Sequence, residues 1–216
     1  MAQAIIFDMD GLLIDSEPLW RESEVETFKK WGYPFREEYC FETMGMRVDV
    51  VVEHWIGKFG GNQEEKENLS NAIMDAVIER IHAKGELMPG VQELLNLFCE
   101  RKIPMSIASS SYMRVIDAVV DKFRLKEFLD VIYSAENEPF GKPHPGVYLT
   151  TAKKLHVSPE HCLVFEDSIA GVQAAKSAGM KCVAVPTKEI RHKKEFEDAD
   201  YILDSLVDFS FGLLDQ

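Results

Sequence analysis

The sequence contains no long hydrophobic run, no cysteine pair at metal-binding spacing and no excess of positive charge. No stretch approaches the roughly 18 consecutive apolar residues of a membrane-spanning helix. The first residues also lack the basic and apolar regions of a signal peptide. The four cysteines include no CxxC pair, which favours reduced thiols in a cytoplasmic protein over a disulfide framework. A net charge of −13 at pH 7 argues against a nucleic-acid partner, because phosphate backbones attract basic surfaces.

The composition is that of an ordinary globular protein. At 216 residues, 46% of them hydrophobic, the chain is long enough for one core with a modest insertion. Its negative charge does not exclude a small anionic substrate, because a bound divalent cation and local basic groups override the global field. Nothing in the sequence demands more than a monomer.

Short apolar segments alternate with helical patterns along most of the chain. Apolar residues at i, i+3, i+4 and i+7, such as Val91, Leu94, Leu95 and Phe98, predict amphipathic helices between the apolar segments. Ser168 is a capping residue in front of a further helix. This alternation predicts an α/β fold whose parallel sheet is covered on both faces. The expected strands are residues 4–8, 105–109, 131–134, 162–167, 182–186 and 201–203.

A long helical insertion separates the first expected strand from the second. Residues 16–88 contain no convincing strand, and their apolar positions follow helical spacing. We therefore expect a core made of residues 1–15 and 89–216 with a helical domain, 16–88, inserted between them. Its second joint, near 85–89, is rich in Gly and Pro. Because the insertion begins just after the first strand, it should overhang the end of that strand.

Two acidic residues, Asp8 and Asp10, follow the first expected strand directly. Gly11 permits a tight turn there. Two carboxylates this close repel each other unless a cation is bound or one of them takes up a proton. The segment therefore predicts a nucleophile, an acid/base group and a metal site within the first dozen residues.

Further polar clusters follow other expected strands. Ser109 and Ser110 lie at the end of the second strand and in front of a helix, whose N-terminal amides favour an anion. Lys142 lies in a stiff, Pro-containing turn, and Glu166 and Asp167 end the fourth strand. In an open parallel sheet, ligands bind outside the carboxyl ends of the strands. These clusters should therefore meet the first one at a common edge of the sheet.

Each of these residues also has a purely structural interpretation. Ser109 is a plausible helix cap, Lys142 a plausible surface lysine, and Glu166 with Asp167 would favour a helix N-terminus through its dipole. Arg47, at the expected start of a helix in the insertion, either contacts substrate or faces solvent. The three tryptophans fit helical stripes, which predicts that most of them are core residues.

In this order and strand context, Asp8-Met-Asp10-Gly, Ser109, Lys142 and Glu166-Asp167 resemble the four motifs of the haloacid dehalogenase superfamily of phosphotransferases. The helical insertion resembles that family's cap of the first class, and the resemblance covers essentially the whole chain. It implies a Rossmann-like three-layer core with an inserted α-helical cap. Segments 15–20, 44–47 and 142–145 are similar to bacterial phosphatases acting on 2-deoxyglucose 6-phosphate and hexitol phosphates.

The resemblance also implies the catalytic roles. Asp8 would attack phosphorus to form an aspartyl-phosphate. Asp10 would protonate the leaving oxygen and later deprotonate water. A dehalogenase typically lacks this second acid, because halide leaves without a proton. The cofactor would be Mg²⁺, a hard cation, held by Asp8, the main-chain carbonyl of Asp10 and Asp167, with Glu166 in support.

Substrate binding would fall to a second set of residues. Ser109, Ser110 and Lys142 would hold the phosphoryl oxygens, and Arg47 would contact the substrate from the cap. The expected function is a Mg²⁺-dependent phosphatase of small phosphorylated sugars or sugar alcohols.

Two alternatives remain. A β-phosphoglucomutase-type hexose phosphomutase shares these motifs, but in that branch a histidine occupies the position of Trp20. A non-catalytic signalling domain phosphorylated on aspartate is a remote alternative. The position of Asp8 on the first strand and the long insertion count against it.

Overall fold

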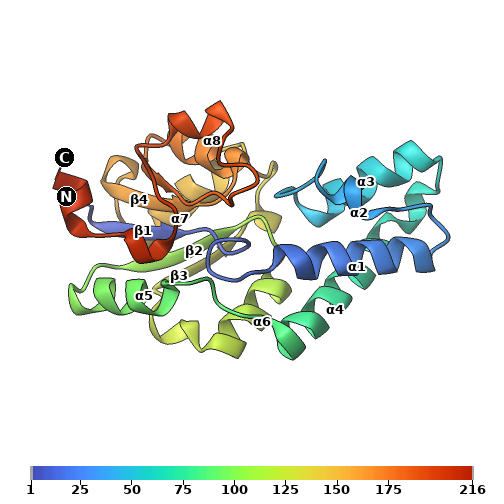
Figure 1. The fold of residues 1–216 in the computed structure, drawn as a ribbon, viewed down its shortest axis with the longest axis horizontal. Helices are drawn as coiled ribbons and strands as arrows, with labels where there is room; N and C mark the ends of the chain where they lie inside the picture. Colours follow the sequence, from blue (N-terminus) through green and yellow to red (C-terminus); the bar gives the residue numbers. More distant parts are fainter. Residues whose placement is uncertain (1, 216) are drawn as a thin grey trace.

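A six-stranded parallel sheet lies at the centre of the fold in the computed structural model, which describes residues 2–215 (Figure 1). The strand order is β3-β2-β1-β4-β5-β6, so the first strand of the chain is central and the strand order reverses beside it. The bounds are β1 (Ala4–Phe7), β2 (Met105–Ser109), β3 (Val131–Ser134), β4 (Cys162–Glu166), β5 (Lys181–Ala184) and β6 (Tyr201–Ile202).

The residues of β1 show why this segment forms the central strand. Ile6 pairs with Ser106 of β2 on one side and Val164 of β4 on the other. Every residue of β1 is fully buried, as expected for a strand covered on both faces. Because successive side chains point to opposite faces, Phe7 packs in one hydrophobic cluster and Ile6 in the other.

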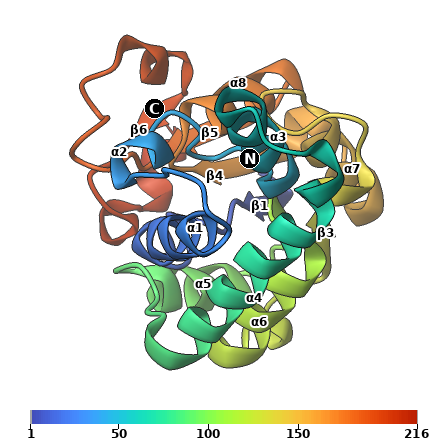
Figure 2. The same ribbon diagram turned by 90° about the vertical axis from the view of Figure 1, so that its right-hand side faces the viewer.

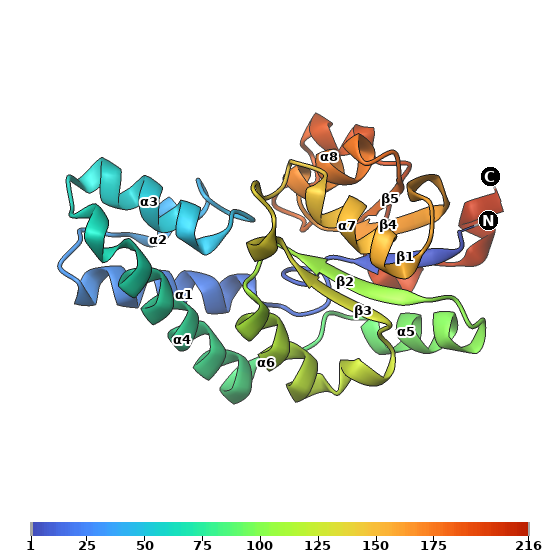
Figure 3. The ribbon, with the colours of Figure 1, turned by 180° about the vertical axis from the view of Figure 1, so that it is seen from behind.

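Helices cover both faces of the sheet and complete three layers. Helices α5 (Val91–Glu100) and α6 (Met113–Phe123) lie on one face, and α7 (Gly146–Leu155) and α8 (Ile169–Ser177) on the other (Figures 1 and 3). Ser168 caps α8 as expected, since its hydroxyl accepts a hydrogen bond from the Gly171 amide. The predicted α/β class with a parallel sheet is therefore confirmed.

Four further helices lie together beyond the carboxyl ends of the strands. They are α1 (Glu17–Lys30), α2 (Glu37–Cys40), α3 (Val48–Phe59) and α4 (Lys66–Lys84), and Figure 2 shows them in front of the sheet. We call residues 16–88, which contain them, the cap. Stacked aromatic rings hold it together, with ring centroids 4.3 Å apart for Phe28 and Phe35 and 4.8 Å for Tyr39 and Trp55.

The two connections between cap and core run side by side. The Asp15 amide donates to the Glu86 carbonyl, and the Met88 amide donates to the Leu13 carbonyl, both at 3.0 Å. We propose the division into core (1–15 and 89–216) and cap (16–88) at these paired segments; residues 1 and 216 lie outside the described residues.

The remaining short elements are 3₁₀ turns. They are η1 (Gln63–Glu65), η2 (Leu125–Glu127), η3 (Ala135–Asn137), η4 (Pro159–His161), η5 (Lys194–Asp198), η6 (Leu206–Asp208) and η7 (Phe211–Asp215).

None of the helices described for residues 2–215 has the length and apolar character needed to cross a membrane.

The contact between η6 and the start of α5 requires a glycine. Gly90 has φ +89°, and a Cβ there would lie 2.6 Å from the Val207 amide nitrogen. Gly32 has a similar φ, +85°, but open space around it. We expect Gly32→Ala to lower the free energy of unfolding by about 1 kcal/mol through the left-handed backbone alone. Gly90→Ala should lose about 1–3 kcal/mol more, because the backbone of η6 must shift.

Urea unfolding with unchanged slopes measures both losses. Equal losses in the two variants would show that η6 gives way freely and does not constrain position 90.

Candidate active site

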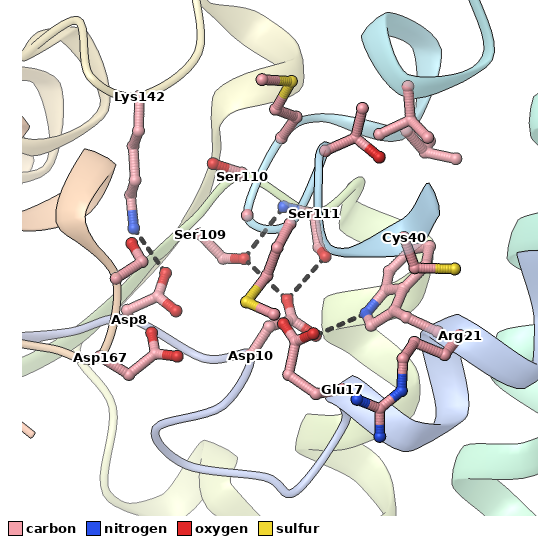
Figure 4. Close-up of a pocket in the computed structure, with 18 of the residues that line it drawn as sticks. Asp8, Asp10, Glu17, Arg21, Cys40, Ser109, Ser110, Ser111, Lys142 and Asp167 are labelled. Atoms are coloured by element: carbon pink, nitrogen blue, oxygen red, sulfur yellow. Dashed lines mark hydrogen bonds and ion pairs between the residues drawn. The ribbon is translucent and has the colours of Figure 1, made fainter. Parts of the chain in front are cut away.

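The residues singled out in the sequence meet at the carboxyl edge of the sheet, beneath the cap (Figure 4). Asp8 and Asp10 follow β1, Ser109 ends β2, and Asp167 follows β4. Lys142 reaches the same point from the loop before α7. All five line one pocket between the core and the cap.

Lys142 lies between two carboxylates. Its ammonium is 2.5 Å from Asp8 Oδ1 and 2.6 Å from Glu166 Oε1, and its side chain is 3% exposed. The Tyr148 hydroxyl also donates to Glu166 Oε1, at 2.5 Å. Glu166 Oε2 accepts from the amide and the hydroxyl of Ser168, both at 3.0 Å. The Glu166 carboxylate is therefore occupied in holding Lys142 and the turn before α8.

Burial and the charge of Lys142 compete, and they shift the pKa values of the three acids in different directions. It raises the pKa of Asp8 to about 8, although Lys142 opposes the shift, and the charges of Glu166 and Asp10 add to it. Burial, together with Glu166 and Asp8, raises the pKa of Asp167 well above its usual value. Burial would also raise the pKa of Glu166, but Lys142 and the hydrogen bonds from Tyr148 and Ser168 together outweigh burial, and the pKa is lowered. For Lys142 burial works against the charge, yet Asp8 and Glu166 prevail and its pKa is raised.

The excess of carboxylates over ammonium groups at this place fits a divalent cation. Oxygen atoms of Asp8, Glu166 and Asp167 lie within 4.8 Å of one another. When all three are ionised, three carboxylates against one ammonium leave two negative charges, which is the charge that one divalent ion neutralises. Buried carboxylate oxygens are the hard ligands that Mg²⁺ prefers. Gly11 lets Asp167 approach, since a Cβ at its φ of +77° would lie 2.2 Å from Asp167 Oδ2.

Asp10 is held by four donors. Its Oδ1 accepts from the Ser16 hydroxyl at 2.7 Å and from the Trp20 indole N–H at 2.8 Å. Its Oδ2 accepts from the hydroxyls of Ser109 at 3.3 Å and Ser111 at 2.7 Å. Core and cap thus both orient this carboxylate. The Ser109 hydroxyl also accepts from the Ser111 amide, a turn that leads into α6.

Two of the three tryptophans, Trp55 and Trp20, pack in or against the hydrophobic core, as expected for most of them. Trp55 is 3% exposed and belongs to the cap core, whereas Trp31 is 37% exposed. Trp20 lines the pocket and donates to Asp10. The helical spacing of the apolar residues around Trp20 correctly predicts α1, but this spacing does not show which of them face the pocket.

Arg47 does not face solvent, which was one of its two expected places. It is absent from the described lining of the pocket, yet its side chain is only 16% exposed. The guanidinium pairs with both oxygens of Asp49, at 2.8 and 2.9 Å. It also donates to the carbonyls of Ala135 at 3.0 Å and Glu138 at 3.1 Å. These partners occupy its donors at the boundary of α3 and the core loop, and its contact with substrate stays a prediction. Ser110 does line the pocket.

The cap side of the pocket carries polar residues that the sequence analysis did not single out. Glu17, Arg21 and Glu24 of α1 line it together with Cys40 and Thr43. Burial raises the pKa of Glu17 to about 7, with the charge of Asp10 adding to the shift. Burial likewise raises the pKa of Glu24 to about 7, although a hydrogen bond from the Cys40 thiol opposes the shift.

Known proteins resemble this chain over nearly its full length. The family model for haloacid dehalogenase-like hydrolases matches residues 5–185. Hexitol phosphatase B of Escherichia coli strain K12 is 36% identical over 208 residues, covering 96% of this chain and 94% of that protein. The crystal structure of CbbY from Rhodobacter sphaeroides in complex with phosphate has a TM-score of 0.89 and 29% identity, covering 100% of both chains. That of β-phosphoglucomutase from Clostridium difficile has a TM-score of 0.84 and 25% identity, covering 100% of this chain and 96% of that one.

The raised pKa of Glu24 predicts a pH-dependent stability. With a pKa of about 7 when folded and 4.5 when unfolded, the folded protein holds a proton between these values that the unfolded chain has released. The stability of the wild type therefore falls as pH rises through this window. Glu24→Gln removes the titration, so the variant should gain stability relative to the wild type between pH 5 and pH 8, by on the order of 2–3 kcal/mol.

Urea unfolding at both pH values measures the gain. Glu22→Gln is the matched control, because Glu22 is exposed and pairs with Lys84, which keeps its pKa below 4.5. If Glu24→Gln and the wild type show parallel pH dependence, Glu24 is not the buried acid described.

Proposed function

The chain belongs to the haloacid dehalogenase-like hydrolase family, and we propose that it hydrolyses small sugar or sugar-alcohol monophosphates with Mg²⁺ as cofactor. It is a phosphoric monoester hydrolase. The observation that carries the proposal is the pair of acids after β1, of which Asp8 lies against Lys142 and Asp10 is held by four donors. The identity to hexitol phosphatase B supports the substrate class.

The two acids divide the reaction between them. An Asp8 carboxylate oxygen forms a bond to phosphorus while the bond from phosphorus to the sugar oxygen breaks, and a proton from Asp10 goes to that oxygen. In the second half, water attacks phosphorus, Asp10 takes its proton, and the bond to Asp8 breaks to release phosphate. Asp10 thus returns to its starting state after each turnover.

Lys142 and the serines after β2 hold the transferring phosphoryl group. The Lys142 ammonium already lies 2.5 Å from the proposed nucleophile, so it is positioned to neutralise oxygens brought next to Asp8. Ser109 and Ser110 line the same end of the pocket. Positioning and charge supply most of the catalysis in phosphoryl transfer.

Asp8 and Asp167, with the main-chain carbonyl of Asp10, would hold the metal. When bound, Mg²⁺ neutralises the charge that otherwise keeps the nucleophile and the phosphoryl group apart. Glu166 would support the site through Lys142, because its own oxygens accept from Lys142, Tyr148 and the turn before α8.

Trp20 favours hydrolysis over phosphoryl transfer between sugar positions. An indole N–H donates a hydrogen bond but cannot accept or relay a proton, unlike the histidine of the mutase branch. The position of Asp8 after the first strand and the cap inserted behind it also argue against a phosphorylated signalling switch.

The leaving group tests the role of Asp10. Asp10→Asn should slow phosphorylation of Asp8 by sorbitol 6-phosphate roughly a hundred-fold or more, because an alkoxide needs a proton. It should slow p-nitrophenyl phosphate much less, because p-nitrophenolate leaves unaided. Single-turnover kinetics measure both rates.

Two further variants serve as controls for this result, one inactive and one unaffected. Asp8→Asn should abolish turnover of both esters, and Asp117→Asn, exposed on α6, should change neither. An equal loss on both esters in Asp10→Asn would remove the general-acid role.

Metal removal tests the cofactor. Activity should vanish with EDTA and return with Mg²⁺, while Ca²⁺ should substitute poorly because its looser coordination misplaces the attacking oxygen.

Mg²⁺ should also raise the melting temperature of the wild type. It should not do so for Asp167→Asn, which lacks one of the buried charges. Full activity after exhaustive chelation would refute a metal requirement.

A further inference from the structure

We propose that the cap end of the active-site pocket is an acidic polyol site, in which Glu24 and Glu17 select substrates whose end remote from the phosphate is uncharged. This inference rests on the proposed function, because it concerns which phosphate esters the same pocket accepts. It assigns to two glutamates of α1 a role in specificity.

The acids of α1 fall into two groups. Glu17, Arg21 and Glu24 are spaced i, i+4 and i+7 and line the pocket, as residues of one helical face do. Glu22 and Glu26 point elsewhere and pair with cations of α4: Glu22 with Lys84 at 2.6 Å and Glu26 with Arg80. Neither Glu17 nor Glu24 forms a salt bridge within residues 2–215. The acids on the outside of the helix are thus neutralised and those in the pocket are not.

Glu24 is the more buried of the two. The residue is 8% exposed, and the donor facing its carboxylate is the Cys40 thiol, a weak one. A carboxylate offers about four acceptor positions, so the Cys40 thiol leaves positions on Glu24 open to a further donor from the pocket. The hydroxyls of a polyol chain are donors of the right kind, and Thr43, 3% exposed, adds a neutral hydroxyl to the same wall.

The same wall repels a second anion. Of the described residues that line the pocket, two carry a cationic side chain, Lys142 and Arg21. Lys142 is engaged at the phosphate end by Asp8 and Glu166. Figure 4 shows the Arg21 guanidinium beside Glu17, and Arg21 also pairs with Glu37 at 3.8 Å. A carboxylate or second phosphate at the cap end would therefore meet two acids with one cation shared between them, and like charges brought together in a pocket provide discrimination.

A matched pair of substrates isolates this charge. Sorbitol 6-phosphate and 6-phosphogluconate have the same carbon chain and the same hydroxyl stereochemistry, and they differ at C1, which is CH₂OH in one and a carboxylate in the other. At pH 8 with Mg²⁺, we expect the wild type to favour the hexitol phosphate in kcat/KM by about ten-fold or more, the equivalent of about 1.4 kcal/mol.

Substitution of the acids should reduce this preference. Glu24→Gln keeps the shape and removes the charge, so KM for 6-phosphogluconate should fall while KM for sorbitol 6-phosphate rises, and the ratio should shrink several-fold. Glu17→Gln should act in the same direction and carries the test if Glu24→Gln folds poorly. Glu22→Gln removes one charge from the same helix outside the pocket. It should leave the ratio unchanged, which separates a local effect from the net charge of the protein.

The outcomes separate the two proposals. A wild type that hydrolyses sorbitol 6-phosphate and 6-phosphogluconate equally well overturns the acidic polyol site and leaves the phosphatase function intact. So does a ratio that is unchanged in both Glu24→Gln and Glu17→Gln. A wild type that hydrolyses neither sugar phosphate nor p-nitrophenyl phosphate overturns both the function and the site.

Discussion

The ion pairs of Lys142 are the interaction on which the rest of the site depends. One ammonium lies between Asp8 and Glu166 where all three side chains are largely buried, so the carboxylates there would be uncompensated without it. The fold is built around this arrangement. Helix α8 approaches so closely that a Cβ at Gly171 would lie 1.7 Å from Glu166 Oε1. The charge left after Lys142 is counted makes the same place suited to a divalent cation and to a phosphate ester bound beside it.

The link between cap and core passes through one carboxylate. Asp10 accepts from Ser109 and Ser111 of the core, and from Ser16 and Trp20 of the segment that enters the cap. A displacement of α1 therefore changes the surroundings of the group proposed to move the proton. The acidic polyol site lies on the same helix and gives the cap a second function. One rigid element both recognises the far end of the substrate and orients Asp10.

Much of the fold could be predicted from the sequence because a doubly covered sheet leaves a plain signal. Continuous apolar runs such as Ala4–Phe7 cannot be solvent-exposed strands, and the polar residues that follow them must gather at one edge. Glu24 could not be recognised in this way. Helix α1 is acidic on the outside, where ion pairs neutralise the charge, and acidic on the inside, where it lines the pocket, so periodicity alone does not distinguish the two faces. The partners of Arg47 could not be predicted either, because the carbonyls of Ala135 and Glu138 are brought to it only by tertiary contacts.

The central position of β1 has a consequence for the order of events during synthesis. This strand is made before its neighbours in the sheet, because Ile5 pairs with Met105 and Ala4 with Cys162. No sheet can begin until β2 has been made, and the second neighbour of β1 arrives later still. Helices α1 to α4 are contiguous and are complete before β2 emerges. The nascent chain thus holds this apolar segment unpaired until β2 has been made, with the helices of the cap as the first partner available to shield it.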